Sequence, residues 1–270
     1  MKFVAFLLLP VIISCRQKNT TDLSALSFFA RGEWIDLSYE FSEKTLYWPT
    51  AGGFSLDTAF EGVTPAGFYY SAYNFCAAEH GGTHLDAPMH FAKGKWAADE
   101  IPLEKLMGQA VVIDVSEKAL KNPDYLISVA DIEAWEKKNG NIPDDAILFF
   151  RTGYGRFYPD AKKYLGTDER GAEAVSKLHF PGIHPDAAAW LVKNRNIKAT
   201  GVDVASVDYG QSADFKTHQI LYEQNIPGFE NVANLSRLPE KGAFVIALPM
   251  KIKGGSGGPL RIIAWIKNAD

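Results

Sequence analysis

The sequence has little cysteine and no long block of charge of one sign. Cys15 and Cys76 are the only cysteines among 270 residues, which excludes a framework of several disulfides. The net charge is −4, and no run of five or six like charges occurs. The chain therefore lacks the charge pattern of a protein that binds nucleic acid or an anionic membrane surface, and we expect a small-molecule partner.

Long apolar spans and internal repeats are also missing. After the first fifteen residues, no stretch of about 18 apolar residues would form a membrane helix, and no segment recurs at a fixed period. Hydrophobic residues make up 47% of the chain, which is enough for one sizeable core. Because no change in composition marks a second domain, we expect residues 32–270 to form one unit.

The first fifteen residues, MKFVAFLLLPVIISC, differ from the rest. A lysine followed by an apolar run is typical of an export signal peptide, and the final cysteine after a small residue resembles a bacterial lipoprotein signal. A plain signal cleaved nearby, or a short buried segment, is the alternative. We expect residues 1–15 to be the signal, Cys15 to be lipidated and residues 16–31 to be a tether. The protein would then be exported, as a lipid-anchored or periplasmic protein.

Cys76 lies inside a second apolar pattern, FYYSAYNFCA. A free cysteine in such a run is most often a small buried hydrophobic residue, and this is what we expect here. If Cys15 is acylated, no disulfide can form within the chain.

Strand and helix patterns alternate from residue 34 onward. The helical patterns are residues 128–139, with an acidic first turn and a glycine after the last residue, and residues 185–195, which begin with proline. The strand patterns are WIDLSYEF, FYYSAYNFCA, QAVVIDV, DAILFFRT, IKATGVDV, AFVIALPMKI and LRIIAWIK. The alternation predicts an α/β fold with a mixed β-sheet core and flanking helices.

Residues 80–90, HGGTHLDAPMH, hold three of the six histidines of the chain. Two glycines and a proline argue against a helix, so the segment is expected to be extended or bent. In an extended chain alternate residues share one side, so the side chains at positions 80, 84, 86 and 90 can point the same way. Imidazole and carboxylate groups suit zinc or another divalent transition metal. The segment therefore predicts a metal site formed by His80, His84, Asp86 and His90.

This segment resembles the H-x-G-T-H-x-D-x-P-x-H signature of the cyclase family of metal-dependent hydrolases, which includes bacterial kynurenine formamidases and isatin hydrolases. Similar segments continue through RTGY, GVDVASVD, THQILYEQNIPGFENVANL and GGPLRIIA. The resemblance implies a single domain of the swivelling β/β/α type. The chain departs from the family pattern in its N-terminal extension and in a longer stretch at residues 161–177. The longer stretch affects the expected size of the substrate.

The resemblance also implies a ligand set for one or two Zn²⁺ or Mn²⁺ ions. His80, His84, Asp86 and His90 are the first candidates, and His218 and Glu230 complete a second position. Six ligands exceed what one tetrahedral ion accepts, so a carboxylate such as Asp86 is expected to bridge two ions. In the alternative with one ion, the remaining groups orient water or substrate.

A divalent ion held in this way acidifies water, so hydrolysis needs no serine or cysteine nucleophile. His90 or Glu230, where not occupied as a ligand, would carry a proton to the leaving nitrogen. The predicted function is hydrolysis of an amide of a small aromatic substrate, first of the N-formylkynurenine type and second an isatin-like lactam. A protein of another class, a lipoprotein that holds metal and binds a small molecule without turnover, is the alternative. Members of this family usually form dimers, so the resemblance also implies that this protein is a homodimer.

Three further features have two interpretations each. Trp48 either forms a wall of an aromatic pocket or packs in the core. Arg151 either holds a substrate carboxylate or pairs with Asp203 or Asp208. The GGSGG run at residues 254–258 has the composition of a phosphate cradle, but because a strand pattern follows it we interpret it as a turn.

Overall fold

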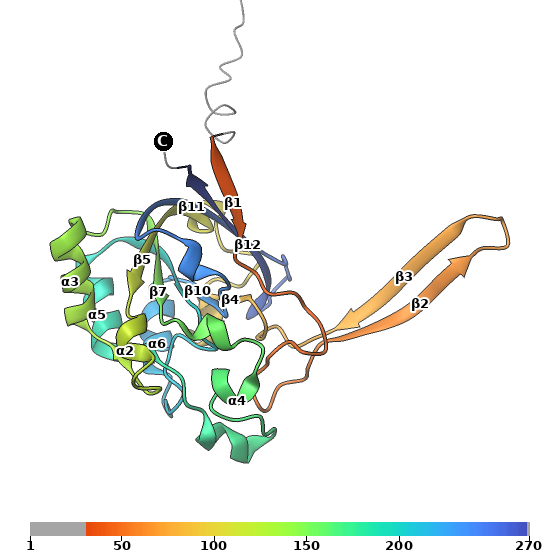
Figure 1. The fold of residues 1–270 in the computed structure, drawn as a ribbon, viewed down its shortest axis with the longest axis horizontal. Coiled ribbons are helices and arrows are strands. Elements are labelled where there is room, and N and C mark those ends of the chain that lie inside the picture. Colours follow the sequence, from red (N-terminus) through yellow and green to blue (C-terminus); the bar gives the residue numbers. More distant parts are fainter. Residues whose placement is uncertain (1–30, 269–270) are drawn as a thin grey trace, which may run out of the picture.

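The computed structural model describes residues 31–268 as one α/β domain around a mixed sheet of eight strands, as predicted (Figure 1). The residues of the proposed signal peptide and most of the tether, 1–30, lie outside the described part. The strands of the sheet, in chain order, are β1 (Gly32–Asp36), β4 (His84–Asp86), β5 (Met107–Asp114), β7 (Ala146–Arg151), β9 (Ile197–Val202), β10 (Gly228–Glu230), β11 (Lys241–Pro249) and β12 (Gly257–Lys267).

The sheet closes on itself. Its order is β1-β12-β11-β5-β7-β9-β10-β4, and β4 also pairs with the first residues of β12. Seven strands therefore form a ring, and β1 pairs with the far end of β12. The strands from β5 to β10 are parallel and the other pairs are antiparallel. Closure places the short strand β4 between β10 and β12, which are both far from it in the sequence.

The central strands are buried on both faces, which explains their nearly continuous apolar sequences. In β5, Ala110 and Val112 contribute to the core inside the ring, whereas Val111 and Ile113 contribute to the core under the helices. The helices on that side are α3 (Val129–Asn139), α5 (Pro185–Asn194) and α6 (Lys216–Tyr222) (Figure 1). The two predicted helices correspond to α3 and α5. The helix α6 and the short strand β10 were not predicted, whereas β4 lies in the segment that was expected to be extended or bent.

The boundaries of α3 and α5 follow from their end residues. Ser128 and Asp131 form a reciprocal capping box at the start of α3, and Gly140 ends it with a φ of 84°. Pro185 opens α5, where its missing N–H costs nothing, and the His184 side chain accepts from the next free backbone N–H.

The remaining elements are short. They are α2 (Ser116–Ala119), α4 (Ala161–Tyr164), β6 (Leu126–Ile127), β8 (Gly182–Ile183), and the 3-10 turns η1 (Pro88–His90), η2 (Leu103–Lys105), η3 (Tyr154–Phe157), η4 (Ala172–Lys177) and η5 (Leu235–Arg237). In the part of the chain that the structure describes, no helix is long and apolar enough to cross a bilayer.

Two strands, β2 (Ser55–Val63) and β3 (Tyr69–Cys76), form a separate hairpin that projects from the body (Figure 1). We call residues 55–76 the arm. The strand prediction for FYYSAYNFCA is confirmed, but the expected burial of Cys76 is wrong because this cysteine is exposed. The arm pairs with no strand of the large sheet, and most residues of its two strands are exposed.

Candidate metal centre

The predicted ligand segment folds as a bent loop followed by a strand. Gly82 adopts a φ of 55°, which a residue with a side chain rarely adopts, and a Cβ at Gly81 would lie 2.0 Å from the ring of Tyr47. The two glycines therefore allow the chain to turn under Tyr47 and enter β4. Within β4, His84 and Asp86 are alternate residues and project to the same side.

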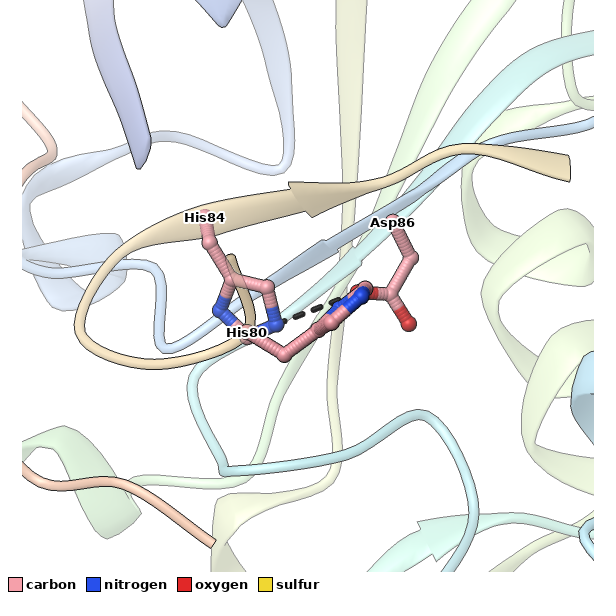
Figure 2. A group of neighbouring side chains, drawn as sticks. All are labelled: His80, His84 and Asp86. Atoms are coloured by element: carbon pink, nitrogen blue, oxygen red, sulfur yellow. Dashed lines mark hydrogen bonds and ion pairs between the residues drawn. The ribbon is translucent and has the colours of Figure 1, made fainter. Parts of the chain in front are cut away.

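A first group joins His80, His84 and Asp86 (Figure 2). His80 Nδ1 lies 2.6 Å from Asp86 Oδ1, and His84 Nε2 lies 3.1 Å from the same oxygen. His80 comes from the loop before β4, and it reaches Asp86 because the glycine pair reverses the chain between them. The predicted convergence of these three side chains is present in the structure.

A second group joins Asp86 to His218 of α6 and Glu230 of β10. His218 Nε2 lies 3.3 Å from both Asp86 Oδ2 and Glu230 Oε1. Glu230 also faces the first group, since its Oε2 lies 3.4 Å from His84 Nε2. The two oxygens of Asp86 thus face different groups, as expected for a carboxylate that bridges two ions.

Most of the cluster is buried, and its carboxylates favour positive charge on the groups between them. Burial lowers the pKa of His84, but the facing carboxylates of Asp86 and Glu230 outweigh it and raise this pKa to about 10. The pKa of His218 is likewise raised despite burial, through Asp208, Asp86 and Glu230. The pKa of Asp86 is held well below its ordinary value, because the surrounding histidines outweigh its burial.

One atom of the cluster tests whether a metal ion fits. His84 Nε2 is buried and has no hydrogen-bond partner, whereas His84 Nδ1 faces the carbonyl oxygen of Gly82 at 3.0 Å. If Nδ1 donates its hydrogen to that carbonyl, the lone pair of Nε2 points toward the carboxylates. A buried acceptor facing other acceptors is satisfied by a cation, so the residues fit a divalent metal ion.

Several residues that the sequence analysis did not assign to the site hold the ligands in place. Asp208 Oδ2 lies 2.5 Å from His218 Nδ1, so the opposite nitrogen faces the cluster. The Tyr222 hydroxyl donates to Asp86 Oδ2 at 3.0 Å, and the backbone N–H of Val207 donates to Glu230 Oε1 at 2.8 Å. Asp208 lies in the GVDVASVD segment, ten residues before His218, and this carboxylate is the only sequence signal for the contact.

His90 is not a member of either group. Its ring stacks on the ring of His80, with centroids 3.8 Å apart, and burial lowers its pKa to about 4. The prediction that His90 is a metal ligand is therefore not supported by the geometry. Its other predicted role, proton transfer, is compatible with its position on the wall of the cavity over the cluster.

This cavity has a volume of about 300 Å³. None of its described lining residues is a lysine or an arginine. Trp48 forms part of the wall, as one of its two interpretations predicted, and also packs edge-on against Phe180. Leu165, from the longer stretch at residues 161–177, contributes as well. The larger apolar side chains of the lining are Leu46, Tyr47, Trp48, Phe91, Leu165 and Phe215.

Arg151 pairs with neither Asp203 nor Asp208. Its guanidinium donates to Asp114 Oδ2 at 2.7 Å and to the carbonyl oxygens of Leu235 and Leu238, and it does not line the cavity over the metal cluster. Arg151 ends β7, and its partner is the residue that ends the neighbouring strand β5 in register. Asp203 instead accepts hydrogen bonds from Thr152.

The chain is similar to known families in sequence. The family model described as "Putative cyclase" matches residues 35–209. Isatin hydrolase from Roseibium aggregatum is 34% identical over 209 residues, which cover 74% of this chain and 77% of that protein. Kynurenine formamidase from Salinibacter ruber is 29% identical, over 68% of this chain and 74% of that protein.

Solved structures agree with these relatives. Isatin hydrolase A from Labrenzia aggregata, bound to benzyl benzoate, has a TM-score of 0.82 and 31% identity, over 91% of this chain and 98% of that one. Isatin hydrolase A from Ralstonia solanacearum has a TM-score of 0.80 and 31% identity, over 97% of this chain and 100% of that one.

Proposed function

We propose that this chain, which belongs to the Cyclase family, is a metal-dependent hydrolase that cleaves the carbon–nitrogen bond of a small, neutral cyclic amide. One observation carries the proposal: two groups of largely buried ligand side chains share Asp86 beside an apolar cavity, and His84 Nε2 has no hydrogen-bond partner. The donor set of imidazoles and carboxylates favours Zn²⁺ or Mn²⁺.

The residues of the site have two roles, metal binding and proton transfer. A divalent ion bound here would lower the pKa of water and polarise the amide carbonyl. His80, His84, Asp86, His218 and Glu230 would hold the metal. Both oxygens of Glu230 face histidines of the cluster, and Oε1 also accepts from a backbone N–H. His90, which is outside both groups, is left to carry a proton to the leaving nitrogen.

The cavity favours a neutral aromatic lactam over an amino-acid amide. Trp48, Phe91 and Phe215 supply flat apolar surfaces. The nearby guanidinium of Arg170 donates to the carbonyl oxygens of Tyr47 and Ala51 and does not line the cavity. N-formylkynurenine would bring a charged ammonium and carboxylate into this space, and the carboxylate would find no lysine or arginine among the described lining residues. Isatin is planar and neutral.

Substrate preference gives the first prediction. With Mn²⁺ or Zn²⁺ present, we expect kcat/KM for isatin to exceed that for N-formylkynurenine by at least about tenfold, or ~1.4 kcal/mol. The product of each reaction is followed by its absorbance under identical conditions. Trp48→Ala is expected to lower kcat/KM for isatin roughly 3- to 10-fold through lost ring contact, whereas Trp34→Ala, on the distant strand β1, is expected to have no effect.

Two results would change the assignment. A faster reaction with N-formylkynurenine would favour an arylformamidase, the activity for which several relatives are named. Binding of either compound by metal-loaded protein without turnover of amides, lactams or lactones would instead support a non-catalytic binding protein.

The arm supports the proposal that the protein is a homodimer. The part of the chain that the structure describes has thirteen exposed large hydrophobic side chains, and eight of them lie on the arm. These eight are Leu56, Phe60, Val63, Phe68, Tyr69, Tyr70, Tyr73 and Phe75. At about half exposure they present on the order of 800 Å², which is what one partner contributes to a standard interface. An isolated two-stranded hairpin is marginally stable in water, so covering it also stabilises it.

A second copy fits the arm better than a lipid surface does. The charged residues of the arm are Asp57 and Glu61, and it has no lysine or arginine. An acidic arm is repelled by an anionic membrane. The apolar side chains of the arm can pack against the equivalent surface of an identical chain about a two-fold axis.

The oligomer prediction is tested with a charged arm. Leu56 and Phe75 face each other across the hairpin. Leu56→Lys together with Phe75→Glu removes apolar surface but keeps an attractive cross-strand pair. By light scattering we expect wild type at about twice the chain mass of 29.8 kDa and this variant at about that mass. Leu103→Lys, on exposed surface outside the arm, is the control. A variant that stays dimeric would contradict the role of the arm.

We also propose that the protein is exported and anchored through a lipid on Cys15. The ISC junction after an apolar run supports this. In cells of the host, we expect wild type in the membrane fraction and Cys15→Ser outside it. Once its signal segment is cleaved, a chain without an acylated cysteine has no lipid anchor. Equal membrane recovery of the two proteins would contradict lipidation.

A further inference from the structure

The second nitrogen of His80 points away from the metal cluster, toward the glycine-rich run at residues 254–258. His80 Nε2 lies 2.8 Å from Ser256 Oγ. The Ser256 hydroxyl donates to Glu79 Oε2 at 2.6 Å, and the backbone N–H of Ser256 donates to the same oxygen at 3.1 Å. Glu79, Ser256 and His80 thus form a continuous chain of hydrogen bonds that ends at the ligand group.

The glycines of this run allow its backbone to lie close to His80 and Glu79. A Cβ on Gly257 would lie 2.7 Å from His80 Cε1 and 2.5 Å from the carbonyl oxygen of Leu85. A Cβ on Gly255 would lie 2.7 Å from Glu79 Oε1. These positions exclude any larger residue without displacement of the ligand or its partner. The run begins in the predicted turn, and its last two residues, Gly257 and Gly258, open β12; its composition serves the imidazole and not a phosphate.

The position of Ser256 is fixed by the sheet. The first residues of β12 pair with β4 in antiparallel register, with Gly257 opposite Asp86 and Pro259 opposite His84. The carbonyl oxygen of Ser256 also accepts from the backbone N–H of Ala87 at 2.8 Å. Closure of the ring of strands therefore sets the hydroxyl beside the ligand segment.

The direction of the hydrogen bonds determines the tautomer of His80. Glu79 accepts from the Ser256 hydroxyl, so the hydroxyl oxygen is left to accept from His80 Nε2–H. The lone pair of Nδ1 then faces Asp86 Oδ1, which is also an acceptor, and a cation satisfies both atoms. We propose that Ser256 and Glu79 are positioning residues that keep His80 in the Nε2-protonated form and thereby raise the metal affinity of the His80–His84–Asp86 group.

This inference rests on the metal-binding part of the proposed function, and it requires no assumption about the substrate. Asp208 plays a comparable role for His218, where it contacts Nδ1 directly. The two histidines therefore present opposite nitrogens to the cluster: Nδ1 for His80 and Nε2 for His218. Hydrogen-bond partners behind metal-bound histidines typically contribute about 10- to 100-fold to metal affinity.

The test measures metal binding without substrate. In chelator competition with Zn²⁺ and with Mn²⁺, Ser256→Ala is expected to weaken one ion per chain by about 10- to 100-fold and to leave any second ion unchanged. Ser256→Thr, which keeps the hydroxyl, is expected to retain most of the affinity. Ser38→Ala is the matched control, because the Ser38 hydroxyl also hydrogen-bonds β12, at Ile262, but far along the strand from His80.

Two readouts separate positioning from general loss of structure. Because Glu79 acts through the hydroxyl, Glu79→Gln combined with Ser256→Ala is expected to weaken binding by less than the product of the two single effects. Nitrogen-15 spectra of zinc-loaded protein are expected to show a slowly exchanging proton on His80 Nε2, which is lost in Ser256→Ala. Unchanged affinity in Ser256→Ala, or metal bound at His80 Nε2, would overturn the inference. Wild type that binds no metal would overturn the proposed function as well.

Discussion

Removal of metal by a strong chelator is expected to abolish hydrolysis, by at least about 1000-fold, and addition of Mn²⁺ or Zn²⁺ is expected to restore it. The reason is the composition of the centre: two carboxylates and two histidines are buried in contact with one another, and His84 Nε2 has no other partner. Among the described residues that line the cavity no lysine or arginine is available to stabilise an anionic transition state. The measurement is the initial rate on the best substrate before and after dialysis.

A ligand variant gives the matched comparison. His84→Ala is expected to be inactive at any metal concentration while its circular dichroism spectrum stays native. His179→Ala is the control, since His179 is an exposed histidine paired with Asp124 outside the cavity. Full activity in protein shown by elemental analysis to be free of metal would contradict this prediction, and so would restoration of His84→Ala by added metal.

The second large effect concerns the number of ions. The structure divides the ligands into His80, His84 and Asp86 on one side and Asp86, His218 and Glu230 on the other. With saturating metal we expect about two ions per chain, because one tetrahedral ion does not accept this many ligands. The double variant His218→Ala, Glu230→Gln is expected to bind about one ion, and Asp86→Ala, which alters both groups, is expected to bind close to none.

Elemental analysis after gel filtration in metal-containing buffer measures these ratios. His80→Ala is the matched comparison on the opposite side of the cluster, and it should also retain about one ion, held by the second group. A ratio near one in both wild type and the His218→Ala, Glu230→Gln variant would remove the two-ion interpretation. The hydrolase assignment would stand in that case, with His218 and Glu230 orienting water or substrate.

The ligand strand and the helix ends could be predicted because they depend on short-range rules. An extended chain places His84 and Asp86 on one side whatever surrounds it. The capping residues of α3, Ser128 and Asp131, satisfy backbone groups within three positions of themselves. The apolar runs of β5 and β7 are continuous because those strands are buried on both faces.

The arm shows where such rules end. The alternation of aromatic residues predicted the strand at residues 69–76 correctly, but it did not predict that the strand leaves the domain. Burial of Cys76 depends on whether another layer covers the hairpin, and periodicity contains no information about that layer. Arg151 is similar: its position at the end of a strand was evident, whereas its partner Asp114 became available only through the register of β7 with β5.

Three features of this protein follow from its residues alone: which side chains are available as ligands, that His80, His84 and Asp86 lie within one bent segment, and that the core is α/β. The division of the ligands, the place of His90 outside both groups, and the contacts of Asp208 and Ser256 with the imidazoles depend on the three-dimensional fold. They depend on it because the sheet closes on itself. Residues 84–86 pair with β10 on one edge and with β12 on the other, and these contacts join segments about 145 and 170 residues apart in the chain, beyond the reach of any local pattern.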